Sequence, residues 1–263
     1  MPARMLFAIL LLVPAAAYAG VSATIAEKQR TNTLFVEGNR LRIEEGKRIL
    51  IFDGDAKQLI TIDPAKHTYG VSTEADMKAL GARYRPQMEA AEAQMRKQME
   101  KMPPEQRKQM EEMLRRSGLQ SGQSTEPAKV ETRYEPTGAK RTVAGHSCQM
   151  YRVVENESPE EQCLLPWSAG VIKKDDLEVF NSFGRFMSQV YVGMGREVPK
   201  EVREGMLGDL ARAPGAPLLR LRDGEVVSEV KKLERGTISA DKFAVPAGYT
   251  KTGQADLGFP QEK

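Results

Sequence analysis

Six short segments near the N-terminus decide the fold of this chain: VSATIAEK at residues 21–28, TNTLFVEG at 31–38, RLRIEE at 40–45, RILIFD at 48–53, QLITID at 58–63 and HTYGV at 67–71. Each segment is rich in β-branched residues or alternates polar and apolar residues, which is typical of a strand. The short links between them are built from Gly, Asn, Asp and Pro, the residues that form turns. This order predicts an antiparallel meander, because parallel strands would need helical crossovers between them.

One of these links, Asp53-Gly54-Asp55, invites a second interpretation as a cation-binding loop. An EF-hand needs further oxygen ligands and a closing Glu, and neither follows in this sequence. We therefore interpret the link as a hairpin turn.

Residues 73 to about 117 form a helical insertion, since they are rich in Ala, Glu, Gln, Lys, Arg and Met. Thr73 offers an N-cap for a first helix, Pro86 is expected to kink or restart it, and Pro103-Pro104 ends it. Helical spacing places one stripe of side chains on the first helix, and the second helix carries a further face. The stripe consists of Tyr84, Met88, Met95, Met99 and Met102, and the second face of Met110, Met113 and Leu114.

Beyond a flexible connection at about 117–128, the chain returns to strands, with candidates at KVETRYE, RTVAG, SCQMYRVV and EQCLLPW. A further helix begins near Lys173 and presents an apolar face that includes Phe180, Phe183 and Met187. A weaker helix is expected over 197–210. The tail reads as strands at LLRLR, EVVSEVKKLER and KFAVPAGYTK.

The first 19 residues resemble a signal peptide. Arg4 supplies a positive charge, residues 5–13 are an uncharged apolar run, and Ala17-Tyr18-Ala19 is a small-x-small cleavage site. A transmembrane anchor is the alternative, but crossing a bilayer takes roughly 20 apolar residues. We therefore expect cleavage between Ala19 and Gly20, export to the periplasm, and a mature chain, residues 20–263, that forms a single domain and does not span the membrane.

Export determines whether the two cysteines, Cys148 and Cys163, are expected to form a disulfide. Folding the segment between them about residues 155–156 places one cysteine opposite the other, and an oxidising compartment favours a disulfide. A redox or metal thiol pair would favour C-x-x-C spacing instead. We predict a structural disulfide.

Several short motifs together resemble those of an uncharacterised family of exported bacterial proteins. They are Ile62-Asp63-Pro64 with Thr68-Tyr69, the pattern Gly145-x-x-Cys148-x-x-Tyr151, and the final Phe243-x-x-Pro246-x-Gly248-Tyr249. That family is similar in fold to periplasmic lipoprotein carriers and outer-membrane lipoprotein receptors. The resemblance implies an α+β fold, in which a curved antiparallel sheet forms an incomplete β-barrel with Met-rich and aromatic helices packed on its concave face. It also implies an apolar ligand and no catalytic residue.

Composition excludes several classes of function. The net charge of +3 on 263 residues gives no strong field toward nucleic acid. The two histidines, His67 and His146, stand in no recognisable catalytic motif, so we expect no enzymatic activity, no cofactor and no His- or Cys-based metal site.

We predict a periplasmic binding protein for an apolar or lipid-like small molecule. Methionine is flexible and polarisable, so a Met stripe suits varied apolar partners, although plain helix packing explains it too. The alternatives are an envelope protein-interaction module that docks partners through its Met-rich helices, and Cu(I) handling by Met99-x-x-Met102 and Met110-x-x-Met113. The candidate ligand-binding residues are Tyr84, Met88, Met95, Met99, Met102, Met110, Met113, Phe180, Phe183 and Met187.

Overall fold

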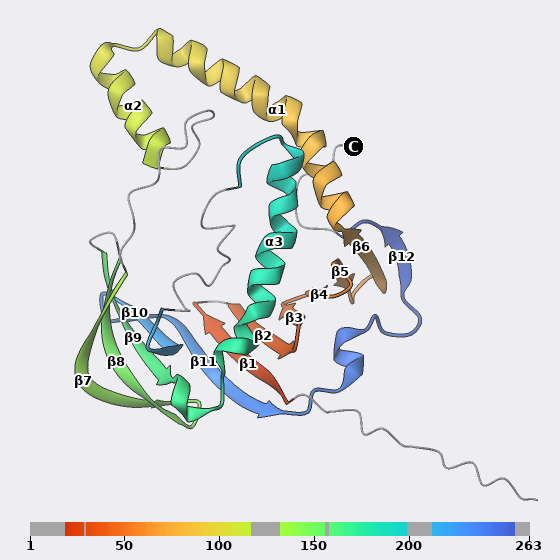
Figure 1. Ribbon diagram of the computed structural model, residues 1–263, viewed down its shortest axis with the longest axis vertical. Coiled ribbons are helices and arrows are strands. Elements are labelled where there is room, and N and C mark those ends of the chain that lie inside the picture. The colour runs from red at the N-terminus through yellow and green to blue at the C-terminus, as the bar shows by residue number, and fades with distance from the viewer. Residues whose placement is uncertain (1–18, 29, 117–131, 156–157, 199–211, 256–263) are drawn as a thin grey trace, which may run out of the picture.

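A computed structural model of the chain describes residues 19–28, 30–116, 132–155, 158–198 and 212–255. These residues form a curved, open sheet of twelve strands, together with three α-helices and three short 3-10 helices. The strand order is β12-β6-β5-β4-β3-β2-β1-β11-β10-β9-β8-β7, so the sheet begins at β12 and ends at β7 without closing. The fold is α+β, as predicted (Figure 1).

The predicted meander is confirmed strand for strand. It comprises β1 (Gly20–Glu27), β2 (Arg30–Glu37), β3 (Arg40–Glu45), β4 (Arg48–Asp53), β5 (Gln58–Asp63) and β6 (Thr68–Thr73). Each strand pairs antiparallel with the next through the turns that the sequence indicates. The side chain of Asp53 accepts hydrogen bonds from the backbone N–H groups of Asp55 and Ala56. Asp53-Gly54-Asp55 is therefore a hairpin turn. The Asp53 carboxylate is used in hydrogen bonds to the backbone of this turn.

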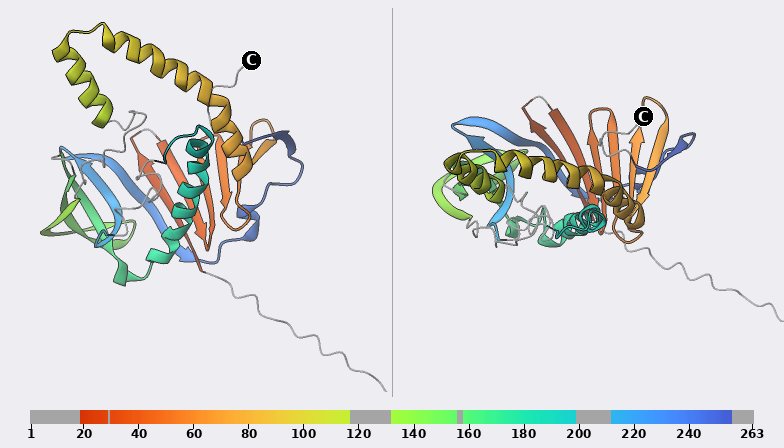
Figure 2. Two further views of the ribbon diagram at one scale, coloured as in Figure 1. Left: turned by 45° about the horizontal axis from the view of Figure 1, so that its top comes forward. Right: turned by 90° about the horizontal axis from the view of Figure 1, so that it is seen from above.

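The second half of the sheet comprises β7 (Arg133–Val143), β8 (His146–Glu155), β9 (Ser158–Pro166), β10 (Gly215–Arg222) and β11 (Glu225–Gly236). Its interior face carries a core cluster to which β1 contributes Val21, and which includes both cysteines, Met150, Leu165 and Leu218. Across this half of the sheet, Nε2 of His146 on β8 lies 3.3 Å from the carbonyl oxygen of Leu233 on β11. This half of the sheet is thus strongly curved around a packed core (Figure 2).

The disulfide between Cys148 and Cys163 is present, with 5.4 Å between the two Cα atoms. The pairing of the hairpin is shifted by two residues from the sequence prediction, because Glu155 pairs with Ser158 and Cys163 pairs with Met150 rather than with Cys148. The disulfide therefore joins a diagonal pair on one face. Both cysteines are buried.

Replacing both cysteines with alanine should lower the free energy of unfolding by roughly 2 to 3 kcal/mol, because the crosslink restricts a short loop of the unfolded chain. Chemical denaturation of the double variant beside the oxidised wild type measures this loss. A difference below roughly 0.5 kcal/mol would contradict it, since changes of that size are ordinary for surface substitutions.

Helix α3 (Glu178–Gly193) follows two 3-10 turns, η1 (Trp167–Ala169) and η2 (Lys174–Leu177), and crosses the concave face over β2–β5 (Figure 1). The buried residues Val179, Phe186 and Val190 pack it against the sheet. The Phe52 ring of β4 lies 5.2 Å from that of Phe183 and 5.4 Å from that of Phe186. The aromatic helix is thus where the sequence predicts it.

Helix α1 (Glu74–Glu100) begins at the β6 edge with a capping box between Thr73 and Asp76. Hydrogen bonds from the backbone and the side chain of Thr73 lower the pKa of the Asp76 carboxyl group. Pro86 lies inside this helix, which is continuous, so the expected restart at Pro86 is wrong, while the expected kink stays a prediction. Proline is accommodated where the lost hydrogen bond faces solvent, and Pro86 is exposed.

Beyond its base, α1 projects away from the sheet, and α2 (Pro104–Arg116) turns back toward the β7–β9 half (Figures 1 and 2). We refer to residues 94–116 as the arm. Packing of the Met-rich helices on the concave face stays a prediction, since α1 packs mainly against α3 and β6. The expected connection at 117–128 and most of the weaker helix at 197–210 lie outside the described residues.

Of the predicted C-terminal strands, LLRLR and EVVSEVKKLER are confirmed as β10 and β11, whereas KFAVPAGYTK is not a strand over most of its length. Residues 236–255 form a strap that crosses the convex face at the 3-10 helix η3 (Ala240–Phe243) and reaches the sheet edge at the short strand β12 (Thr250–Gly253), which pairs parallel with β6. Arg42 donates a hydrogen bond to the carbonyl of Lys242, and the guanidinium of Arg40 lies 4.6 Å from the Phe243 ring centroid. The conspicuous Phe243-to-Tyr249 motif therefore serves to attach this strap.

Candidate functional site

Three parallel rows of side chains cross the concave face of β1–β5, and they differ in burial. Cross-strand pairing defines the first row as Val21, Val36, Leu41, Phe52 and Leu59. All five are buried, and α3 covers the part of the row on β2–β5. This row is the core beneath the helix.

The second row lies two residues further along the strands and consists of Ala23, Leu34, Ile43 and Leu50. All four side chains are half-buried, so α3 covers this row only in part. At a strand spacing of about 4.8 Å, the row is roughly 14 Å long. We call it the apolar row.

The third row is polar apart from one member, and consists of Ile25, Asn32, Glu45 and Arg48. An exposed ion pair of 3.2 Å joins Arg30 to Glu45 at this end of the strands. Across the concave face, the surface therefore changes from buried and apolar, through half-buried and apolar, to polar and wet. Such a gradient suits a molecule that has one apolar end and one polar end.

Of the predicted site residues, Phe180, Phe183 and Met187 lie on α3 and are half-buried against the core cluster that contains the β2–β5 members of the first row. Three members of the apolar row, Leu34, Ile43 and Leu50, pack against the same cluster. The next group, Tyr84, Met88, Met95, Met99, Met102 and Met110, lies on α1 and α2, and each of its side chains is half-buried. The side chain of Met113 is outside the described residues.

Sequence reasoning missed the apolar row and Asn32. The signal for the row was present as the alternation of Leu34 with Val36 and of Leu41 with Ile43. Asn32 continues that alternation two residues before Leu34, at a position where the pattern calls for an apolar side chain. A polar residue at an apolar position of the strand alternation was therefore the sequence signal that could have identified Asn32.

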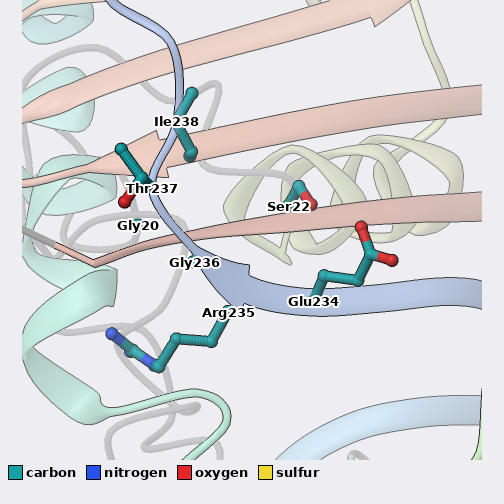
Figure 3. Close-up of a pocket in the computed structure, with 7 residues that line it drawn as sticks. All are labelled: Gly20, Ser22, Glu234, Arg235, Gly236, Thr237 and Ile238. Atoms are coloured by element: carbon teal, nitrogen blue, oxygen red, sulfur yellow. The ribbon is translucent and has the colours of Figure 1, made fainter.

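A separate pocket of about 330 Å³ lies where the strap leaves β11, lined by Gly20, Ser22, Glu234, Arg235, Gly236, Thr237 and Ile238 (Figure 3). Its charged groups are already engaged. Arg235 donates to the carbonyls of Ala19 and Val171 and pairs with Asp176, while Glu234 lies 2.9 Å from Lys232. The contacts of Arg235 therefore join the start of β1 to the loop before α3, next to the strap.

The convex face carries a paired cluster on β9 and β10. Burial alone would raise the pKa of the Glu160 carboxyl group, but hydrogen bonds from Arg220 and Arg222 together lower it. The described residues contain no group of three or more His, Cys, Asp or Glu side chains that could hold a metal ion. Among the helices described, none is both long and apolar enough to cross a membrane.

Comparisons with known proteins give a family and two distant structures. Residues 70–249 match the model of a family described as a domain of unknown function, DUF4412. No curated protein matches the chain. The structures of PNGF-II in the C2 and P21 space groups align with 93% of this chain at TM-scores of 0.33, with 9% and 10% identity. The chain spans about a third of the length of those two, 32% and 33%.

Proposed function

The chain belongs to the DUF4412 family, and we propose that it is an exported, non-enzymatic binding protein that holds an apolar or lipid-like molecule on its concave face. The apolar row carries this proposal. Its four side chains are half-buried, and Leu34, Ile43 and Leu50 pack against the same core cluster as the aromatic and Met side chains of α3. Covering this row with the methylene groups of a ligand gains roughly 0.8 kcal/mol for each group buried.

Two further observations support the proposal. Strand β1 begins at Gly20, the residue that follows the expected cleavage site, so cleavage there would leave the sheet complete. The buried disulfide suits an oxidising compartment such as the periplasm. The similarity to lipoprotein carriers and receptors remains part of this proposal.

Native mass spectrometry of the exported protein, purified without detergent, tests the proposal. We expect an adduct with the mass of a single-chain lipid, and Leu34→Gln should lose it because the substitution places an amide in the apolar row. Thr33→Gln is the matched control, since the neighbouring residue points to the convex face. A bare polypeptide mass in the wild type, together with failure of added single-chain lipids to bind, would contradict the proposal.

A second candidate function rests on the arm, which projects from the sheet with its half-buried Met side chains (Figure 1). In this alternative, the arm docks another envelope protein. Deleting residues 94–116 should then abolish capture of that protein while the lipid adduct persists. Added mass matching copper, lost in the same deletion, would instead support Cu(I) handling by the Met side chains.

A further inference from the structure

Asn32 has a buried side-chain oxygen that lies in the concave register of β2. It pairs across the sheet with Ile25 on one side and Glu45 on the other, and Leu34 follows it on the same face. Two residues of strand separate it from Leu34, which is about 7 Å. Asn32 therefore lies beside the apolar row, at its border with the polar row.

Within the part of the chain that the structure describes, the Oδ1 atom of Asn32 is buried and has no hydrogen-bond partner. A buried acceptor without a donor destabilises a fold, because it has lost water and gained nothing in exchange. Native proteins contain few such groups, and each one calls for an explanation.

The neighbours of Asn32 restrict the ligand. Glu45 is exposed and already paired with Arg30, so the charges next to Asn32 lie at the wet end of the strands and leave its buried oxygen without a donor. An uncharged N–H or O–H group can reach a buried oxygen at a small desolvation cost, whereas burying a full charge there costs far more.

We infer that Asn32 accepts a hydrogen bond from the head group of the bound molecule, and that the ligand is a single-chain amphiphile with an uncharged N–H or O–H donor next to its hydrocarbon chain. The chain lies along the apolar row beside Phe183 and Met187, and the donor lies at Asn32. This inference rests on the proposed function, because it names the ligand class of the same site.

Two probes that differ only in the donor test the inference: N-dodecylacetamide, and dodecyl acetate, in which oxygen replaces the N–H group. Calorimetric titration of both into the wild type and into Asn32→Leu gives a thermodynamic cycle in which the different hydration of the probes cancels. The preference for the amide over the ester should fall about tenfold in Asn32→Leu, as expected for one hydrogen bond to a buried acceptor.

Thr33→Val, on the opposite face of the same strand, should leave the preference unchanged. Asn32→Leu should melt no lower than the wild type, since it removes an unsatisfied acceptor; if this variant does not fold, Asn32→Ala replaces it in the cycle.

The outcomes separate the two proposals. Binding of both probes with an unchanged or reversed preference in Asn32→Leu overturns the inference and leaves the proposed function standing. Failure of both probes to bind the wild type overturns the proposed function and this inference with it.

Discussion

Replacing Phe52 with alanine should lower the free energy of unfolding by about 4 kcal/mol, the middle of the range for buried aromatic residues. Phe52 is 1% exposed, and its ring contacts both Phe183 and Phe186 of α3. The substitution removes the central contact between the helix and the sheet and leaves a cavity beneath α3. Denaturant unfolding monitored by circular dichroism measures the loss.

Phe35→Ala is the matched control on the convex face. Its ring is half-buried and lies 4.8 Å from the ammonium nitrogen of Lys242, so its removal should cost less than half as much. Equal losses of unfolding free energy for the two variants would contradict the prediction. They would show that packing of α3 on the concave face stabilises the protein no more than packing of the strap on the convex face.

The strands of the meander could be predicted because their signals are local. Alternation in Arg40-Leu41-Arg42-Ile43 and turn residues such as Asp63-Pro64 act over a few positions, and tertiary contacts did not override them. The C-terminal motif was misread for the opposite reason. Phe243 looks like a residue of a strand, but it lies in a strap that contacts Arg40 and Arg42, about 200 positions away.

The candidate site was predictable only in part for the same reason. Helical spacing identified the face of α3 with Phe180, Phe183 and Met187, because that periodicity lies within one element. Which row of the sheet the helix leaves half-covered depends on where α3 crosses it, and no local pattern encodes that position. The apolar row and Asn32 therefore emerge only when the strands are placed in register.

Changing Gly81 to alanine should destabilise the protein by about 3 kcal/mol, although alanine is the better helix former by about 1 kcal/mol. Gly81 lies where α1 crosses α3, and a Cβ atom there would stand 1.9 Å from the carbonyl oxygen of Val190. The reciprocal position, Gly193, would place its Cβ 2.0 Å from the carbonyl oxygen of Lys78. Because both obstacles are backbone atoms, the helices must separate to admit a methyl group.

Separation would also weaken the polar contacts of the same interface, in which Arg85 donates to the carbonyl of Gly193 and Arg196 pairs with Glu92. We therefore expect the melting temperature of Gly81→Ala to fall by about 10 °C and α1 to become the first site of proteolysis. Gly236→Ala is the control, since a Cβ there meets no atom within 4 Å. The sign of the change in stability decides between helix propensity and the close contact. A more stable Gly81→Ala variant would mean that helix propensity outweighs the close contact and that the base of the arm can move away from α3.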